Sequence, residues 1–266
     1  MNVLDFREEV WQKGRELYRD MPWRDTTAPY YVLVSELMLQ QTQVDRVIPK
    51  FELFMTMFPT ITDLANAPLA DVLTAWSGLG YNRRAKFLHE AAKKVVIEHG
   101  GSIPGTYEGL VSLPGIGPNT AGAIVAYSFN QPIVYIETNV RTVYFHHFFE
   151  DQATVTDTEL RELAAQTMDA EHPREWYWAL MDYGSYLKKQ GVGRINKSSH
   201  YKKQAPLKGS LREIRGLILK SLAVSDATED ELRTSLPDDE RFATALAALL
   251  SEGMVGQTSG RLHLAR

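Results

Sequence analysis

The spacing of apolar residues is the strongest constraint on how this chain can fold. Along most of its length they recur three or four positions apart, as in Val44, Val47, Ile48, Phe51 and Phe54, which is the pattern of an amphipathic helix. The strict alternation typical of strands is scarce before residue 250. Short segments with Gly and Pro interrupt the helical pattern at intervals, as turns do. The sequence therefore predicts a protein that is mainly all-α.

Size and composition indicate an ordinary folded protein. The 266 residues are enough for about two domains, and a content of 44% hydrophobic and 23% charged residues is typical of globular domains. No uninterrupted apolar stretch reaches the roughly 18 residues that a membrane span needs. Residues 1–18 carry too many charges for a signal peptide. We expect a cytoplasmic protein with no membrane partner.

Charge and cysteine content exclude several kinds of site. The formal net charge is −4, so any surface for nucleic acid must be local. The chain has no cysteine, which excludes disulfides, thiolate zinc sites, cysteine nucleophiles and iron–sulfur clusters held by cysteine. Positive charge gathers in one segment, where a single acid, Glu213, accompanies Lys188, Lys189, Arg194, Lys197, Lys202, Lys203, Lys208, Arg212, Arg215 and Lys220.

A small unit follows a linker expected near residues 204–210. Three helices are predicted to begin near Ser210, Thr228 and Asp239, and alternating apolar residues around a turn at 257–260 predict a terminal hairpin. This order of elements suggests a winged helix. The third helix, at 241–250, has one arginine and many alanines, so packing or partner binding suits it at least as well as reading bases in a DNA groove.

A glycine turn at residues 113–118 is the first candidate for a binding site. Gly115 and Gly117 are followed by Pro118, which suits the first position of a helix. Glycines let a phosphate approach the backbone, and the unpaired N–H groups at a helix start can bind that anion. An ordinary turn between two helices is the alternative interpretation.

Two acids are candidates for catalysis. Glu36 lies in an apolar run with glutamines one turn later, and Glu137 follows the short apolar run 133–136. A carboxyl among apolar side chains has a raised pKa, as a general acid requires. A protonated and an ionised carboxyl together can break a glycosidic bond. Alternatively, Glu36 pairs with an arginine or caps a neighbouring helix, and Glu137 begins a helix.

Taken together, these segments resemble the adenine DNA glycosylases of the MutY type, in the helix-hairpin-helix superfamily of base-excision enzymes. The similarity covers about residues 20 to 187. The run Gln40-Gln41-Thr42-Gln43 and the motif Gly78-Leu79-Gly80-Tyr81 are specific to this branch. The motifs that carry it are Met21-Pro22-Trp23-Arg24, 35–44, Phe58-Pro59-Thr60, Leu64-Ala65, 78–81, 113–124 and Met181-Asp182-Tyr183-Gly184.

The resemblance implies a helix-hairpin-helix glycosylase fold of two helical subdomains. We expect them at 21–130 and at 1–20 with 131–205, followed by a winged-helix-like domain at 206–266. Such an enzyme binds double-stranded DNA that contains a mismatch or lesion, and it extrudes the target nucleotide from the duplex. We expect a nucleoid-associated monomer that removes a mispaired adenine, opposite 8-oxoguanine or guanine, and leaves an abasic site.

The resemblance also implies roles for individual residues. Glu36 would protonate the departing adenine, and Glu137 would stabilise or capture the sugar cation. Gln40, Gln41 and Tyr81 would fill or probe the vacated stack, although Tyr81 has packing under its loop as an alternative. The backbone from Gly115 to Asn119 would hold a phosphate, with Na⁺ or K⁺ bound by the carbonyls of Leu113 and Ile116 and no metal bound by side chains. The remaining residues expected at the DNA are Gly117, Thr120, Asn139, Lys188, Lys189, Lys202 and Lys203.

Three departures from the family pattern limit what is carried over. Glu137 stands where the family has aspartate, and an acid displaced by about 1.5 Å can lose about 10²-fold in rate. Asn119 replaces the lysine of bifunctional relatives, so a lyase step is not expected. The chain lacks the cysteines of the family's iron–sulfur cluster, and we expect the block Lys188–Lys203 to replace its contribution to phosphate binding.

The C-terminal unit looks too short for the oxidised-guanine recognition domain of many relatives, so the opposite base stays open. A glycosylase for thymine, uracil or another damaged base and a catalytically silent lesion binder are the alternative functions. Three further features of the sequence have structural alternatives. A metal site is only weakly suggested by His146, His147, Glu150 and Asp151. The aromatic cluster Trp176, Tyr177 and Trp178 belongs to the core or stacks on bases. Asp182 caps or braces a helix of the active site.

Overall fold

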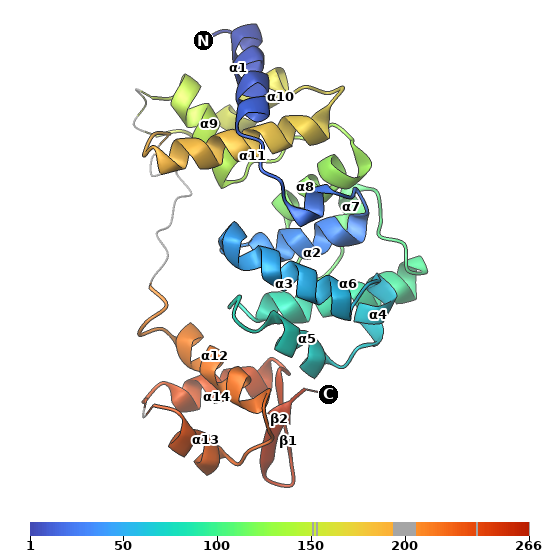
Figure 1. Cartoon of the computed structure of the whole chain (residues 1–266), viewed down its shortest axis with the longest axis vertical. Helices are drawn as coiled ribbons and strands as arrows, with labels where there is room; N and C mark the ends of the chain where they lie inside the picture. The colour runs from blue at the N-terminus through green and yellow to red at the C-terminus, as the bar shows by residue number, and fades with distance from the viewer. Residues whose placement is uncertain (151, 153, 194–205, 238, 266) are drawn as a thin grey trace. The chain divides into compact units, whose positions relative to one another are not determined.

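The computed structural model describes residues 1–150, 152, 154–193, 206–237 and 239–265. They form two compact units, whose helices are labelled in Figure 1. Unit 1 is drawn from Met1–Leu33, Pro104–Ser112 and Ile116–Lys203, and unit 2 from Val34–Ile103, Leu113–Gly115 and Gln204–Arg266. Helix α2 (Pro29–Leu39) begins in unit 1 and ends in unit 2. The predicted division into 21–130, 1–20 with 131–205, and 206–266 stays a prediction.

Unit 1 is a group of helices around α11. It contains α1 (Val3–Glu16), the short 3₁₀ helix η1 (Pro22–Arg24), α7 (Tyr107–Val111), α8 (Pro118–Phe129), α9 (Thr138–Phe148), α10 (Asp157–Thr167) and α11 (Pro173–Lys189). Helix α11 packs against α1, α8 and α9. Phe6, Tyr144 and Trp176 are fully buried among these helices. A side chain at Gly14 would clash with Ala179, so glycine allows α1 and α11 to approach closely.

Unit 2 has its first core around α6. Its N-terminal helices are α3 (Val44–Met57), α4 (Ile61–Asn66), α5 (Leu69–Trp76) and α6 (Arg83–His99). Helix α6 packs against α4 and α5, and α3 packs against α5. Phe54, Trp76 and Leu88 are fully buried, which places the apolar stripe seen in the sequence at the centre of this helical group.

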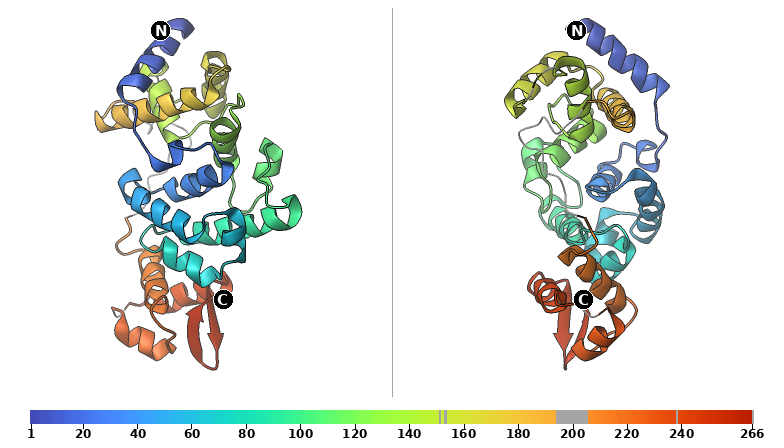
Figure 2. Two further views of the ribbon diagram at one scale, coloured as in Figure 1. Left: turned by 45° about the vertical axis from the view of Figure 1, so that its right-hand side comes forward. Right: turned by 90° about the vertical axis from the view of Figure 1, so that its left-hand side faces the viewer.

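The C-terminal part of unit 2 has the predicted three helices and hairpin. They are α12 (Leu211–Leu222), α13 (Glu229–Ser235), α14 (Phe242–Ser251), β1 (Val255–Thr258) and β2 (Arg261–Leu264), and Figure 2 shows the two antiparallel strands. Val255 pairs with Leu264 and Thr258 with Arg261. Ser259 and Gly260 turn the chain with φ values of +49° and +78°. The hairpin is therefore short and tightly closed.

Helix starts in this part follow ordinary capping chemistry, with one correction. Ser210 and Thr228 precede α12 and α13 as predicted, and Thr228 forms a capping box with Glu231. Helix α14 begins at Phe242 and not near Asp239. The reason is local, because the Asp239 carboxylate accepts the backbone N–H of Arg241 at 2.9 Å and fixes a turn before the helix.

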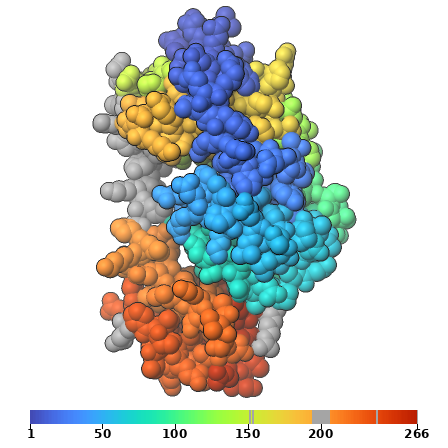
Figure 3. Space-filling model, in the orientation of Figure 1, coloured from blue at the N-terminus to red at the C-terminus, as the bar shows by residue number. Residues whose placement is uncertain are grey.

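The third helix of this part is poorly suited to reading DNA. The exposed side chains of α14 include Ala243, Thr244 and Ala247, which carry no charge. Figure 3 shows the C-terminal part as the orange and red surface.

No helix among the described residues is long and apolar enough to cross a membrane.

Candidate active site

Glu36 lies on α2 among buried apolar side chains. Leu33, Val34, Leu37 and Met38 are almost completely buried, whereas Glu36 is half-buried. The helix is thus apolar on nearly every side, and Glu36 is its acid. Carboxyl groups that act as general acids in enzymes are often found in such apolar surroundings.

Arg84 on α6 joins the end of α2 to the loop that carries Tyr81. One terminal nitrogen of its guanidinium donates to the carbonyl oxygens of Leu37 at 2.7 Å and Met38 at 2.9 Å, and also to that of Gln40. The other donates to the carbonyl of Gly80 at 3.0 Å. Burial lowers the pKa of Arg84 to about 10, so the group stays charged at neutral pH.

Arg84 is not among the residues predicted from the sequence. Its position three residues after the Gly-Leu-Gly-Tyr motif was the available signal, but arginine is usually a surface residue. By binding carbonyl groups from both segments, Arg84 fixes the glutamine run Gln40–Gln43 against the loop 78–81. The structure thereby brings four of the predicted site residues into one unit, namely Glu36, Gln40, Gln41 and Tyr81.

The loop 78–81 holds its tyrosine in an unusual backbone conformation. Gly78 and Gly80 have φ values of +94° and +74°, and Tyr81 itself has a φ of +49°. Glycine adopts this region freely, whereas a residue with a side chain is strained there. The indole N–H of Trp76 donates to the Gly80 carbonyl at 3.2 Å. Tyr81 is half-buried, so it is partly exposed at the end of a braced loop.

The predicted glycine turn connects α7 to α8. Gly115 has a φ of +76°, and a Cβ atom there would lie 2.6 Å from the Cβ of Phe87. Gly117 is the N-cap of α8 with a φ of −86°, and a Cβ there would meet no described atom within 4 Å. No side chain caps α8 among the described residues. The first turn of α8 therefore offers the arrangement of N–H groups that binds phosphate.

Glu137 is the N-cap of α9. Its carboxylate accepts the backbone N–H of Thr138 at 2.7 Å and that of Asn139 at 3.0 Å. The interpretation of Glu137 as a helix start is confirmed, and its carboxylate position is fixed by that role. Asn119 on α8 donates from its side chain to the carbonyl of Ile136 at 2.8 Å. The first turn of α8 and the residue before Glu137 are thereby connected within unit 1.

Asn139 links Glu137 to the end of α11. Its side-chain oxygen accepts the ammonium of Lys188 at 3.2 Å, and its side-chain amide lies 3.8 Å from the Met181 sulfur. A side chain at Gly184 would clash with the Asn139 backbone, so glycine there lets α11 approach α9. Unit 1 therefore brings together Asn119, Glu137, Asn139 and Lys188.

Asp182 braces α11 against the N-terminal segment, as one of its two predicted roles requires. Its carboxylate accepts both terminal nitrogens of Arg24 at 2.7 and 3.0 Å, and also Nε of Arg19 at 2.7 Å. The side chains of Arg24 and Asp182 are 3% and 0% exposed. A buried pair with this bidentate geometry holds the segment before η1 in place.

The other predicted residues fall as follows. Thr120 is buried in α8, and Lys189 is exposed on α11. Lys202 and Lys203 lie outside the described residues. Leu113 and Gly115 belong to unit 2, whereas Ile116 and Gly117 belong to unit 1. Glu36 and Glu137 belong to different units, and their meeting stays a prediction.

The weaker candidates have structural roles. Trp176 and Tyr177 are buried, which confirms their interpretation as core residues. His147 accepts or donates a hydrogen bond at the Tyr183 hydroxyl, 2.9 Å away, and burial lowers its pKa to about 4. No group of acids and histidines among the described residues could hold a metal, and Asp151 lies outside them.

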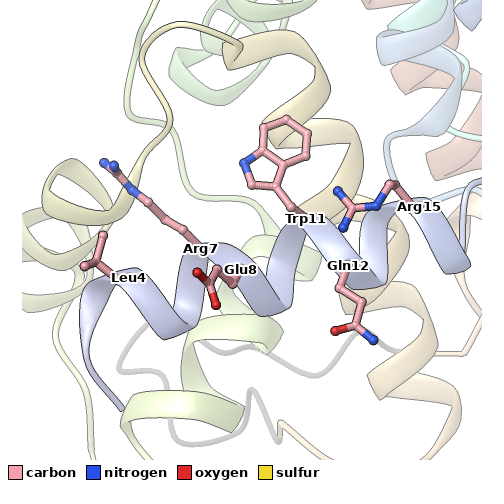
Figure 4. Close-up of a pocket in the computed structure, with 6 residues that line it drawn as sticks. All are labelled: Leu4, Arg7, Glu8, Trp11, Gln12 and Arg15. Atoms are coloured by element: carbon pink, nitrogen blue, oxygen red, sulfur yellow. The ribbon is translucent and has the colours of Figure 1, made fainter.

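A shallow depression of about 550 Å³ lies along α1. Figure 4 shows that it is lined by Leu4, Arg7, Glu8, Trp11, Gln12 and Arg15. Arg7 and Trp11 are engaged with the end of α10, since Arg7 donates to the Thr167 carbonyl at 2.8 Å and Trp11 to Asp169 at 3.2 Å. The depression contains none of the predicted site residues.

Comparison with solved structures finds glycosylases of the same fold. A thermostable thymine-DNA glycosylase matches with a TM-score of 0.63 and 25% identity, over 69% of this chain and 86% of that one. A non-covalent endonuclease III–DNA complex matches with a TM-score of 0.60 and 18% identity, over 77% of this chain and 90% of that one. The predicted helix-hairpin-helix glycosylase fold is confirmed.

Comparison with curated proteins finds relatives across nearly the whole chain. An adenine DNA glycosylase of Mycobacterium tuberculosis is 32% identical over 93% of this chain and 89% of its own length. The human adenine DNA glycosylase is 41% identical over 69% of this chain, which corresponds to 36% of the human protein. The model of the HhH-GPD superfamily base excision DNA repair protein matches residues 34–167. This chain therefore belongs to the HhH-GPD superfamily of base excision DNA repair proteins, among its adenine DNA glycosylases of the MutY type.

Proposed function

We propose that this chain is a monofunctional DNA glycosylase that removes a mispaired adenine, opposite 8-oxoguanine or guanine, from double-stranded DNA. The carrying observation is the match to an adenine DNA glycosylase across 93% of the chain. The alignment extends beyond the family domain at residues 34–167 and into the C-terminal part. The protein acts as a monomer in the cytoplasm, at the nucleoid.

In the proposed reaction, the bond between C1′ of the sugar and the adenine nitrogen breaks, water adds to C1′, and the proton that this water loses returns to the Glu36 carboxylate. Glu36 gives its proton to the departing adenine, which leaves as a neutral base. Glu137 carries negative charge next to the sugar cation and stabilises it. The observed hydrogen bonds from Thr138 and Asn139 fix the position of this carboxylate. Asn119 has no amine that could form a Schiff base, so no strand cleavage follows.

Phosphate binding is assigned to the glycine turn at residues 113–118 with the first turn of α8, and to the basic segment Lys188–Lys203. The backbone N–H groups between Gly115 and Thr120, apart from Pro118, which has none, hold a phosphate beside the lesion. Further contacts to the strand come from Asn139, Lys188, Lys189, Lys202 and Lys203. The carbonyl groups of Leu113 and Ile116 lie in the turn outside α7 and α8. Backbone carbonyls are the ligands that K⁺ accepts in proteins, so these two fit a structural Na⁺ or K⁺.

The test is base release from four duplexes that contain A:8-oxoG, A:G, T:G and U:G, followed by alkaline cleavage of abasic sites. We expect release of adenine from the first two, and Glu36→Gln is expected to lower the single-turnover rate by about 10²- to 10⁴-fold, because it removes the acid. Glu52→Gln is the matched control, since Glu52 is exposed on α3. It should react like the unmodified chain.

The same panel separates the alternatives. Release only from T:G or U:G would contradict the choice of adenine, and a thymine-specific activity has support from the 25% identity to a thymine-DNA glycosylase. Mismatch binding without any abasic product, unchanged by Glu36→Gln, would indicate a silent lesion binder.

Glu137→Asp tests whether the longer side chain of Glu137 is misplaced for the reaction or adapted to it. A higher rate indicates misplacement by the extra methylene, and a loss of activity shows that Glu137 is adapted to this site.

A further inference from the structure

In the C-terminal part of unit 2, Arg212 contacts the loop of Tyr81. Arg212, in the first turn of α12, donates a hydrogen bond to the Tyr81 hydroxyl. Its guanidinium carbon also lies over the Tyr81 ring, 4.9 Å from the ring centre. Arg84 lies over the same ring at 5.4 Å. Two guanidinium groups from different helices therefore contact one side chain, with the geometry of cation–π interactions.

Arg212 is well placed to control where the ring points. The backbone of Tyr81 is strained at φ +49°, and such a residue keeps its conformation only when its surroundings hold it. Arg84 secures the carbonyl groups of the loop, whereas Arg212 contacts the hydroxyl at the far end of the side chain. The hydroxyl contact sets the direction of the ring, which the backbone alone does not.

The helix that carries Arg212 is itself anchored to α6. Arg215, one turn later, forms two hydrogen bonds with Glu252 at 2.9 and 2.6 Å. Lys86 of α6 donates to the Glu252 backbone carbonyl, and Arg83 lies 3.8 Å from the Glu252 carboxylate. The first turn of α12 is therefore held at a fixed position against the helix that follows Tyr81.

The surfaces of α13 and α14 argue against a role of these two helices in direct DNA binding. The exposed face of α14 is uncharged, as described above, and the first turn of α13 carries Glu229, Asp230 and Glu231. An acidic surface repels the phosphate backbone. The contact of this part that bears on DNA recognition is therefore sought on α12, at Arg212.

We propose that Arg212 is a positioning residue that holds Tyr81 in the orientation needed to distinguish a mismatch from paired DNA. The inference rests on the proposed function, in which Tyr81 probes the base stack. It gives the C-terminal part a task in mismatch recognition that requires no contact of its own with the bases.

The experiment is a double-mutant cycle on DNA binding. Fluorescence anisotropy gives the Kd of a labelled A:8-oxoG duplex and of the same duplex fully paired, and the ratio of the two is the discrimination. We expect Arg212→Ala and Tyr81→Ala each to reduce this ratio by about 10-fold. The double variant should be no worse than Tyr81→Ala, because both changes remove the same function. Lys220→Ala, an exposed residue on the same helix, is the control and should keep the ratio.

A second variant tests orientation against charge. Arg212→Lys keeps the positive charge but loses the planar guanidinium, so we expect it to lose discrimination as well. Three results would together show that Arg212 contacts a phosphate. Arg212→Lys would keep the discrimination, Arg212→Ala would still weaken binding when Tyr81→Ala is present, and Arg212→Ala would reduce the salt slope by about 1. That combination would overturn the proposal.

The experiment stays decisive if Arg212→Ala fails to fold or if the protein releases no base. If Arg212→Ala unfolds the protein, Tyr81→Phe removes only the hydroxyl that accepts from Arg212, and unchanged discrimination there overturns the inference. If the unmodified chain releases no base but still prefers the mismatch, the proposed function fails while the cycle remains decisive. If it shows no preference in binding, the inference is wrong.

Discussion

Gly115 and Gly117 are glycines for different physical reasons. Gly115 has a positive φ, and a Cβ there would press on Phe87, so the fold itself requires glycine. Gly117 has an ordinary φ and open space around it. A side chain at 117 would instead cover the first turn of α8, where the proposed phosphate lies. The same residue type therefore serves packing at one position and ligand approach at the other.

This difference gives a prediction at the residue scale. Gly115→Ala should lower the free energy of unfolding by about 1–3 kcal/mol, because it adds backbone strain and a clash. Gly117→Ala should change it by less than about 0.5 kcal/mol while weakening DNA binding. Urea unfolding and anisotropy on the same samples measure both. Equal loss of stability in the two variants, or unchanged DNA affinity with Gly117→Ala, would contradict the assignment.

Single residues also show where sequence information ends. The glycine turn was predictable because its backbone requirement is local. The contacts of Arg84 with α2 and of Arg212 with Tyr81 were not, because they join segments that are distant in the sequence. Glu137 lies between these cases, since its role as a helix start followed from position, while the effect of the extra methylene on chemistry does not follow from either sequence or fold.

At the scale of elements, α9 and α11 are joined by a titratable contact. Burial is the main cause that lowers the pKa of His147 to about 4, with His146 and the chain's N-terminus adding to it. The imidazole shares a hydrogen bond with Tyr183, and the Phe6 ring lies 5.4 Å away. The folded protein therefore favours the neutral form of His147.

The sign of the resulting pH dependence follows from this direction. A histidine with a lowered folded pKa contributes stability that is complete above pH 6.5 and lost as the pH falls toward 4. The loss is at most about 3 kcal/mol. Urea unfolding at pH 7, 5 and 4 should show it, and His147→Gln should have a shallower dependence over this range. A variant as pH-sensitive as the unmodified chain would contradict the role of His147.

Element boundaries were predictable where side chains cap the backbone. A helix was predicted to begin near Thr228, and the structure shows Thr228 in a capping box with Glu231 at the start of α13. The alternation of apolar residues around the turn at 257–260 predicted the β1–β2 hairpin. The start of α14 was placed about three residues too early, because Asp239 resembles an N-cap but closes a separate turn with Arg241. A residue that favours both turns and caps does not decide between them.

For the whole molecule, a net charge of −4 has to be reconciled with a polyanionic substrate. The proposal assigns phosphate binding to a local basic segment, of which Lys188 and Lys189 are exposed at the end of α11. Long-range attraction then depends on the distribution of charge and not on its total. The fold could be predicted from sequence patterns at this scale, but the arrangement of Glu36 and Glu137 could not, since they belong to separate units.

Salt dependence tests this view. Reversing Lys188 and Lys189 to glutamate should weaken DNA binding and reduce the slope of log K against log salt by about 2, because each phosphate contact contributes about 0.9. Lys93→Glu with Lys220→Glu changes the net charge equally at exposed positions of unit 2 that lie outside the block Lys188–Lys203, and it should leave the slope nearly unchanged. The basic segment has no such role if both pairs of reversals have the same effect.

The ion pairs of Asp182 with Arg19 and Arg24 limit how far the protein can be shortened from its N-terminus. The matched family domain starts at residue 34, which invites removal of everything before it. Such a truncation would take away both arginines and leave the carboxylate of Asp182, 0% exposed, as an uncompensated charge in the interior, a change that costs about 3–5 kcal/mol. The segment that carries Arg19 and Arg24 is therefore needed for a stable truncated protein.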